Sequence, residues 1–299
     1  MAVQISAGQV KDLREKTGVG MMECKKALEE NNGDMEKAIV WLRERGMSRA
    51  AKKADRIAAE GVVEVLISDS GTEAAVLEVN CETDFVAKNP DFRKLVADTA
   101  QIALKTKCND IEKLGEMKLA DGVSINETIA GLIQKIGENM RLRRVLTISA
   151  PNGHISGYIH MGGRIGTAVV LEGKKDVAEL GKDIAMHVAA ASPRYLNRVE
   201  VDSTELDQEK EIARKKLIEE KKPEAMIEKI LDGQMNKFYK EVCLVEQMFV
   251  KNPDISITKL LETADKNLKL TRFVRFALGE GIEKKQENFA AEVAAQLNR

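Results

Sequence analysis

Aromatic residues are scarce in this sequence of 299 residues, at 4% of the chain, and neither sign of charge is in excess. Proteins that hold single-stranded nucleic acid commonly stack its bases on aromatic side chains, so a stacking platform is not expected. The 47 basic and 48 acidic side chains leave a formal net charge of −1. That balance gives no overall field to attract nucleic acid or an anionic membrane. We therefore expect no strong nucleic-acid binding and no membrane binding.

Long apolar runs and closely paired cysteines are also missing. Runs such as residues 168–171 are far too short to cross a bilayer, and residues 1–11 lack the apolar stretch of a secretory signal. No CxxC pair occurs among the four cysteines, so neither a zinc knot nor a disulfide framework is indicated. These features predict a cytoplasmic protein with free thiols.

The motifs of common enzyme classes do not occur either. There is no GxxxxGK[ST] loop to bind phosphates, and two loose glycine pairs lack the rest of a dinucleotide fingerprint. No GxSxG elbow is present, and the HExxH spacing is not found at any of the three histidines, His154, His160 and His187. We expect no enzyme activity, no direct nucleotide binding, no cofactor and no metal site.

Three helical patterns open the chain. Ser6 is a candidate N-cap for the first, Gly18 and Gly20 separate the first from the second, and Asp34 is a candidate N-cap for the third. Basic residues then predominate as far as Arg56 in an alanine-rich stretch, which predicts a helical linker with a solvated face. We expect residues 1–55 to form a three-helix domain with this basic linker.

A change of apolar period to two begins at Gly61 and predicts a β-hairpin with its turn near residues 69–71. Pro90 then opens a helical pattern, and Ser124 and Glu127 form a capping box for another. A strand pattern closes this part of the chain. We expect residues 56–150 to form one α+β subdomain.

The same order of elements recurs in residues 151–280. A second hairpin pattern comes first, and residues 267–272 (NLKLTR) later match residues 139–144 (NMRLRR). The fold class is therefore predicted to be α+β, with two related subdomains in tandem.

The second half carries an insertion at about residues 200–240. Pro223 splits this highly charged stretch into two helical patterns, which predicts a projecting antiparallel helical hairpin. Residues 281–299 contain an amphipathic pattern from Phe289 to Leu297 and are expected to form a C-terminal helical module.

One segment between a predicted strand and a predicted helix bears on function. It comprises residues 80–90 (NCETDFVAKNP). Thr83 or Asp84 can cap the helix and Phe85 can pack into the core, which would make the segment purely structural. A phenylalanine beside an aspartate at such a corner is also how a protein presents a wedge to a partner. The residues alone leave both interpretations open.

Several long runs carry a resemblance to a known family. They are residues 10–28 (VKDLREKTGVGMMECKKAL), 77–88 (LEVNCETDFVAK), 135–139 (KIGEN), 184–190 (IAMHVAA) and 275–284 (RFALGEGIEK). In order and over the whole chain they resemble bacterial elongation factor Ts, the guanine nucleotide exchange factor of elongation factor Tu. The resemblance implies a UBA-like N-terminal bundle, two core subdomains, a coiled-coil hairpin inserted in the second, and a C-terminal helical module.

The resemblance also implies site residues. Asp84 and Phe85 would intrude between two helices of the G domain of elongation factor Tu and displace its Mg²⁺, within a partner-binding motif formed by Thr83, Asp84, Phe85 and Val86. Further contacts would come from Arg14, Met21, Met22, Lys25, Ile136, Gly137, His160 and Val250. The stretch after His160 is one residue longer than is usual in the family. Dimerisation in the complex is left open.

Two other functional classes remain as alternatives. A protein-binding scaffold would hold a partner without altering nucleotide release. An RNA-associated factor would use the basic stretch before Arg56, and its binding would fall steeply with salt. Exchange of GDP for GTP on elongation factor Tu differs from both because it demands faster loss of bound nucleotide.

Overall fold

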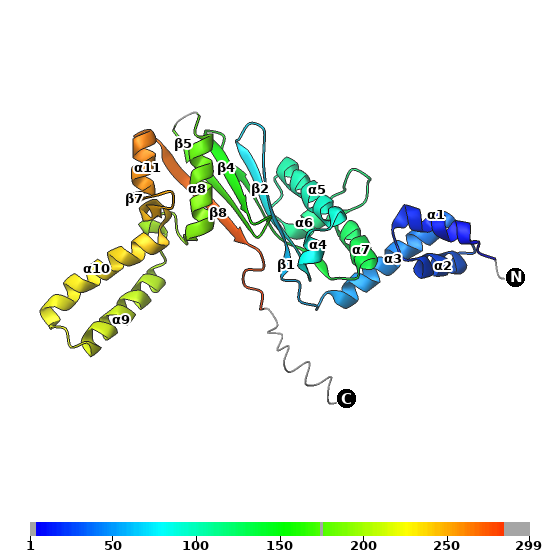
Figure 1. The fold of residues 1–299 in the computed structure, drawn as a ribbon, viewed down its shortest axis with the longest axis horizontal. Coiled ribbons are helices and arrows are strands. Elements are labelled where there is room, and N and C mark those ends of the chain that lie inside the picture. The colour runs from blue at the N-terminus through cyan, green and yellow to red at the C-terminus, as the bar shows by residue number, and fades with distance from the viewer. Residues whose placement is uncertain (1–3, 174–175, 284–299) are drawn as a thin grey trace. The chain divides into compact units, whose positions relative to one another are not determined.

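The computed structural model describes residues 4–173 and 176–283 of the chain (Figure 1). The chain folds into two compact units, each assembled from separate stretches of sequence. The first unit contains Met1–Glu64, Leu77–Leu146 and Ala277–Arg299, and the second contains Val65–Val76 and Thr147–Phe276. The predicted helix at 289–297 lies outside the described residues.

Three helices begin the first unit: α1 (Ala7–Thr17), α2 (Met21–Glu30) and α3 (Met35–Lys53). Ser6 caps α1 through a capping box and Asp34 caps α3, as predicted. The predicted basic linker is helical and forms the second half of α3. A small core holds the three helices together; its buried members are Val10, Leu13, Val19, Cys24, Ala27, Leu28, Ala38 and Leu42.

A three-stranded sheet follows, in the order β1 (Glu60–Ile67), β2 (Glu73–Cys81), β3 (Met140–Ser149). The chain between β2 and β3 forms four helices: α4 (Asp84–Ala87), α5 (Pro90–Thr106), α6 (Ile111–Glu116) and α7 (Ile125–Ile136). Asn89 caps α5 with Pro90 at its first position, and the predicted capping box of Ser124 and Glu127 starts α7. N-caps and capping boxes satisfy the first main-chain N–H groups of a helix, which have no partner within the helix.

The second unit contains the matching sheet, in the order β4 (Gly153–His160), β5 (Ile165–Glu172), β8 (Lys269–Ala277). Strands β4 and β5 pair antiparallel from Gly153 opposite Glu172 to His160 opposite Ile165. Helix α8 (Ala178–Ala191) packs on this sheet (Figure 1). Each sheet thus contains a hairpin and a later third strand, and the fold is α+β as predicted.

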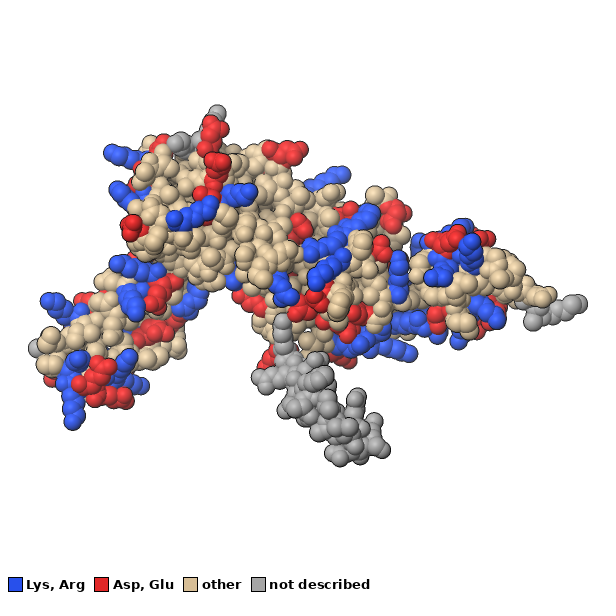
Figure 2. Space-filling view, viewed as in Figure 1, with Lys and Arg blue, Asp and Glu red and all other residues tan. Residues whose placement is uncertain are grey.

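The inserted hairpin consists of α9 (Ser203–Glu219) and α10 (Glu224–Val242), with Pro223 as the N-cap residue of the second helix. Leu217, Ile227 and Leu231 form a small buried cluster between the helices. Lys and Arg lie interspersed with Asp and Glu over this hairpin (Figure 2). The two helices thus pack along a narrow apolar seam.

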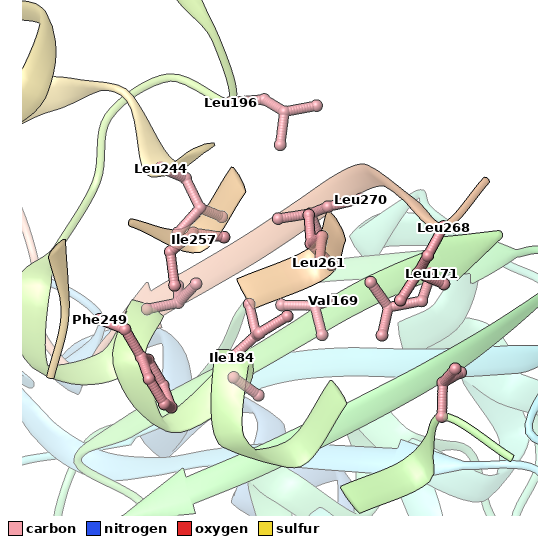
Figure 3. Packing of buried hydrophobic residues seen from close by; sticks show 13 residues of the cluster. Val169, Leu171, Ile184, Leu196, Leu244, Phe249, Ile257, Leu261, Leu268 and Leu270 are labelled. Atoms are coloured by element: carbon pink, nitrogen blue, oxygen red, sulfur yellow. The ribbon is translucent and has the colours of Figure 1, made fainter. Parts of the chain in front are cut away.

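A larger core fills the space under α8 and α11 (Ile257–Ala264). Figure 3 shows Val169 of β5, Ile184 of α8 and Leu270 of β8 among the side chains that converge there. The short helices η1 (Arg198–Glu200) and η2 (Leu244–Glu246) and the short strands β6 (Met248–Phe249) and β7 (Asn252–Ser256) complete the unit. Leu244 and Phe249 from these segments extend the same core (Figure 3).

Within residues 4–173 and 176–283, no helix combines the length and the apolar character needed to span a bilayer.

Glu78 on β2 is a carboxylate with no exposed surface. It bonds Arg143 at 3.1 Å and Arg144 at 2.6 Å, both on β3, and accepts the N–H of Gly279 at 2.8 Å. Burial by itself raises the pKa of this carboxyl, but the bonds from Gly279, Asn80 and Arg144 outweigh it and hold the pKa below its ordinary value. The ionised carboxylate thus ties the chain that leaves β8 to the first sheet.

Glu78→Gln tests the Glu78 anchor, because it keeps the shape of the side chain and removes the charge. A group with a lowered folded pKa stabilises above its unfolded pKa, and the contribution is lost as pH falls through the folded value. We expect roughly 3 kcal/mol of destabilisation at neutral pH. Urea unfolding at neutral and acidic pH should show the gap between variant and wild type closing below about pH 4. A gap independent of pH would contradict this account.

Gly61 allows β1 to approach β2 closely. Its φ is +136°, and a Cβ there would overlap the Val79 carbonyl oxygen and lie 2.7 Å from Asn80 Cα. We expect Gly61→Ala to destabilise the fold by several kcal/mol, on the order of other backbone clashes and strained φ values. Gly233→Ala in α10 is the matched control, because a Cβ there meets nothing within 4 Å. That variant should gain up to about 1 kcal/mol from helix propensity. Thermal melts compare the two, and equal melting temperatures would contradict the close approach.

Candidate functional site

The corner between β2 and α5 is a single helical turn, α4. Thr83 is its N-cap, and its hydroxyl accepts the N–H of Val86 at 3.4 Å. Val86 and Ala87 are buried at 5% and 7% exposure, so this side of the turn faces the core. The opposite side carries Asp84 and Phe85. Asn89 then caps α5, so only Lys88 and Asn89 separate the end of α4 from the start of α5.

Phe85 is 81% exposed, whereas Phe92 on the neighbouring α5 is fully buried. Of the two interpretations left open by the residues, the one in which Phe85 packs into the core does not hold. Burying a phenylalanine side chain stabilises by about 1.5–3 kcal/mol, which this position forgoes. The structure thus leaves an aromatic side chain exposed on a capped turn.

Asp84 is the acidic residue of the first turn of α4. Its carboxylate pairs with Lys88 Nζ at 2.6 Å, one turn along the chain. A carboxylate at a helix N-terminus also interacts favourably with the helix dipole. The residue is half exposed, so it lies beside Phe85 as a second, charged feature of the same surface.

Ile136 and Gly137 lie at the end of α7, and the structure brings them next to this corner. Gly137 caps α7 at φ +93°, and Lys53 donates to its carbonyl oxygen. Glu138, the next residue, accepts bonds from the main chain and side chain of Thr83. Two stretches far apart in sequence, residues 83–85 and 136–138, therefore lie next to each other in the first unit.

Arg14, Met21, Met22 and Lys25 lie on the N-terminal helices of the same unit, and all four are exposed. Met22 is 76% exposed and Met21 40%, at the start of α2. Lys25 pairs with Glu29 on its own helix at 3.7 Å. Two adjacent exposed methionines provide a flexible apolar contact surface.

His160 and Val250 belong to the second unit and lie on different hairpins. His160 ends β4, and its Nδ1 shares a hydrogen bond of 3.1 Å with the Tyr158 hydroxyl. Met161, the first residue of the longer stretch, takes a left-handed conformation in the turn before β5 and is 69% exposed. Val250 lies in the turn between β6 and β7 and is 48% exposed.

The Val250 turn is held by His187, a residue that sequence reasoning did not assign to the site. The Val250 N–H donates to His187 Nδ1 at 3.2 Å, and Nε2 donates to Gln247 Oε1 at 3.0 Å. Burial lowers the pKa of His187, so the ring remains neutral and can accept from Val250. In the sequence, His187 lies in the apolar run 184–190, one of the runs that carry the family resemblance.

The described residues contain no group of three or more histidine, cysteine or acidic side chains arranged to hold a metal ion. Burial raises the pKa of Cys81 to about 12 and that of Cys243 to about 11. Thiols of this kind stay protonated at neutral pH and are poor nucleophiles.

Phe85→Ala separates an exposed side chain from a core side chain. We expect it to change the free energy of unfolding by less than about 0.5 kcal/mol, as for other surface substitutions. Phe92→Ala is the matched control and should lose about 3–5 kcal/mol through cavity formation. Equilibrium unfolding in urea measures the free energy of unfolding of both variants. If Phe85→Ala lost as much stability as Phe92→Ala, Phe85 would have to be a core side chain.

Comparison with known proteins adds independent evidence. Residues 82–280 match the family model for elongation factor Ts, and residues 1–50 match the model for the N-terminal region of mitochondrial elongation factor Ts. The chain is 48% identical to elongation factor Ts of Clostridium acetobutylicum and 49% to that of Clostridium novyi, over 99% of each chain. It is 48% identical to that of Clostridium botulinum over 99% of this chain and 100% of the relative. The chain therefore belongs to the elongation factor Ts family of translation elongation factors.

Proposed function

We propose that this chain binds elongation factor Tu in the cytoplasm and promotes the exchange of its GDP for GTP, with no covalent reaction of its own. Family membership supports the exchange activity. The single observation that carries the mechanism is the exposure of Phe85 on a short, capped turn beside Asp84. In this proposal both side chains enter the G domain and disturb its Mg²⁺ and phosphate site.

A small displacement at that site is sufficient because Mg²⁺ demands near-ideal octahedral coordination by oxygen. Exchange is then a coupling between two binding sites on the partner. If the factor weakens nucleotide binding, nucleotide weakens binding of the factor by the same ratio. Burial of one phenylalanine supplies about 1.5–3 kcal/mol, which corresponds to roughly ten- to a hundredfold in an equilibrium.

The other proposed contacts would supply affinity around the wedge. In the first unit these are Arg14, Met21, Met22 and Lys25 on the N-terminal helices, with Ile136 and Gly137 beside the corner. In the second unit they are His160 and Val250. Their exposure supports this assignment for the methionines and for Val250 in particular.

The RNA-associated alternative is less well supported by the basic stretch of α3. Arg45 and Arg49 both pair with Glu23, at 3.1 and 2.8 Å, and Arg56 pairs with Glu82 at 3.0 Å. Lys53 donates to the Gly137 carbonyl. Groups engaged in this way are less available for phosphates.

Release of fluorescent GDP from elongation factor Tu, followed by stopped flow, tests the proposal. The wild-type chain should accelerate release strongly, and Phe85→Ala should lower the catalytic efficiency roughly ten- to a hundredfold, as the burial energy implies. Asp84→Ala should act in the same direction, more weakly. Val199→Ala is the control, because Val199 is 94% exposed and lies outside the proposed contacts.

Two outcomes would contradict the proposed function. If the wild-type chain binds elongation factor Tu without accelerating release, the chain is a scaffold. If Phe85→Ala remains as active as Val199→Ala, exchange does not depend on the wedge.

A further inference from the structure

The α4 turn, which carries Asp84 and Phe85, is held by the side chain of Glu138, a residue that follows α7. The Thr83 N–H donates to Glu138 Oε2 at 3.0 Å, and the Thr83 hydroxyl donates to Oε1 at 2.7 Å. Both carboxylate oxygens are thus used on one residue, the N-cap of α4. Hydrogen bonds to an ionised group are stronger than those between neutral groups.

These two bonds set the direction of the cap. Because the Thr83 hydroxyl gives its proton to Glu138, its lone pairs remain for the Val86 N–H. A helix of four residues has too few internal bonds to persist without such support. The orientation of Phe85, two residues after the cap, therefore follows from the position of the Glu138 carboxylate.

Glu138 can act as a support because its own segment is held. The Asn139 N–H donates to Glu82 Oε1. The two segments are thus joined reciprocally, because Glu82 accepts from the residue after Glu138 and Glu138 accepts from the residue after Glu82. The Asn139 amide donates to the Arg56 carbonyl at 2.7 Å. We call the Glu138 carboxylate with its two bonds to Thr83 the brace. The brace is held in place by the chain that joins α3 to β1.

We infer that Glu138 is a positioning residue for nucleotide exchange: it holds the Thr83 cap so that Phe85 points outward before the partner arrives. The inference rests on the proposed function of Asp84 and Phe85. Preorganisation removes an ordering cost from binding. Loss of the brace should therefore weaken productive association and leave the wedge effective once it is inserted.

Glu138→Gln is the primary variant, because the amide keeps the size but offers one acceptor oxygen where two donors require it. The concentration of factor that gives half-maximal GDP release should rise roughly tenfold, while the maximal release rate stays near that of wild type. Glu112→Gln is the matched control on the exposed face of α6 and should change neither quantity. Thr83→Val, which removes the hydroxyl, should resemble Glu138→Gln.

A double-mutant cycle identifies the route of the effect. If Glu138 acts through the Thr83 hydroxyl, the combination of Thr83→Val with Glu138→Gln should cost less than the sum of the single changes. Fully additive costs would overturn the inferred link between them.

A measurement on the isolated chain separates this inference from the proposed function. Hydrogen exchange at the Thr83 and Val86 amides should be faster in Glu138→Gln than in Glu112→Gln, with unchanged melting temperatures. Unchanged amide protection overturns the brace, and faster exchange with unaltered half-saturation overturns its role in positioning. If the wild-type chain fails to accelerate GDP release, the proposed function falls, and the role of Glu138 in exchange falls with it.

Discussion

The buried carboxylate of Glu78 is the constraint on which the first unit depends. An ionised group without exposed surface is tolerated only when its charge is matched, and here two arginines of β3 and one main-chain N–H match it. The Gly279 N–H comes from the chain after β8, so residues 201 positions apart in the sequence must meet before the carboxylate is satisfied. The strand that carries Glu78 ends at Cys81, immediately before the Thr83 corner. The ion pairs of Glu78 with Arg143 and Arg144 therefore help to fix the position of the corner.

The same physical device recurs at the corner itself. Glu82 accepts the Asn139 N–H and Glu138 accepts the Thr83 N–H, just as Glu78 accepts that of Gly279. Each carboxylate satisfies a main-chain donor of a distant segment, where regular secondary structure provides no partner. Such bonds carry direction as well as energy, so they fix the orientation of the loops they join. A surface built on them can present an exposed aromatic side chain in one defined direction.

Local sequence signals account for most of the secondary structure. The capping box at Ser124, the Pro90 helix start and the break at Pro223 were predicted because each acts within a few residues of itself. The exposure of Phe85 could not be predicted from residues alone, since the same pattern fits a core side chain. The role of Glu138 was equally inaccessible, because its partner Thr83 is distant in sequence and no periodicity links them.

The exposure of Phe85 also has a consequence for how exchange energy is supplied. Had the side chain been buried in the free chain, its hydrophobic contribution would already be part of the folding free energy. Binding would then have to remove the side chain from the core first, and the net free energy gained by burying it in the partner would be small. A ligand shifts an equilibrium only by its differential affinity for the two states. Under the proposed function, Phe85 at 81% exposure on a braced turn would keep most of its burial energy for the state of the partner in which the Mg²⁺ site is disturbed.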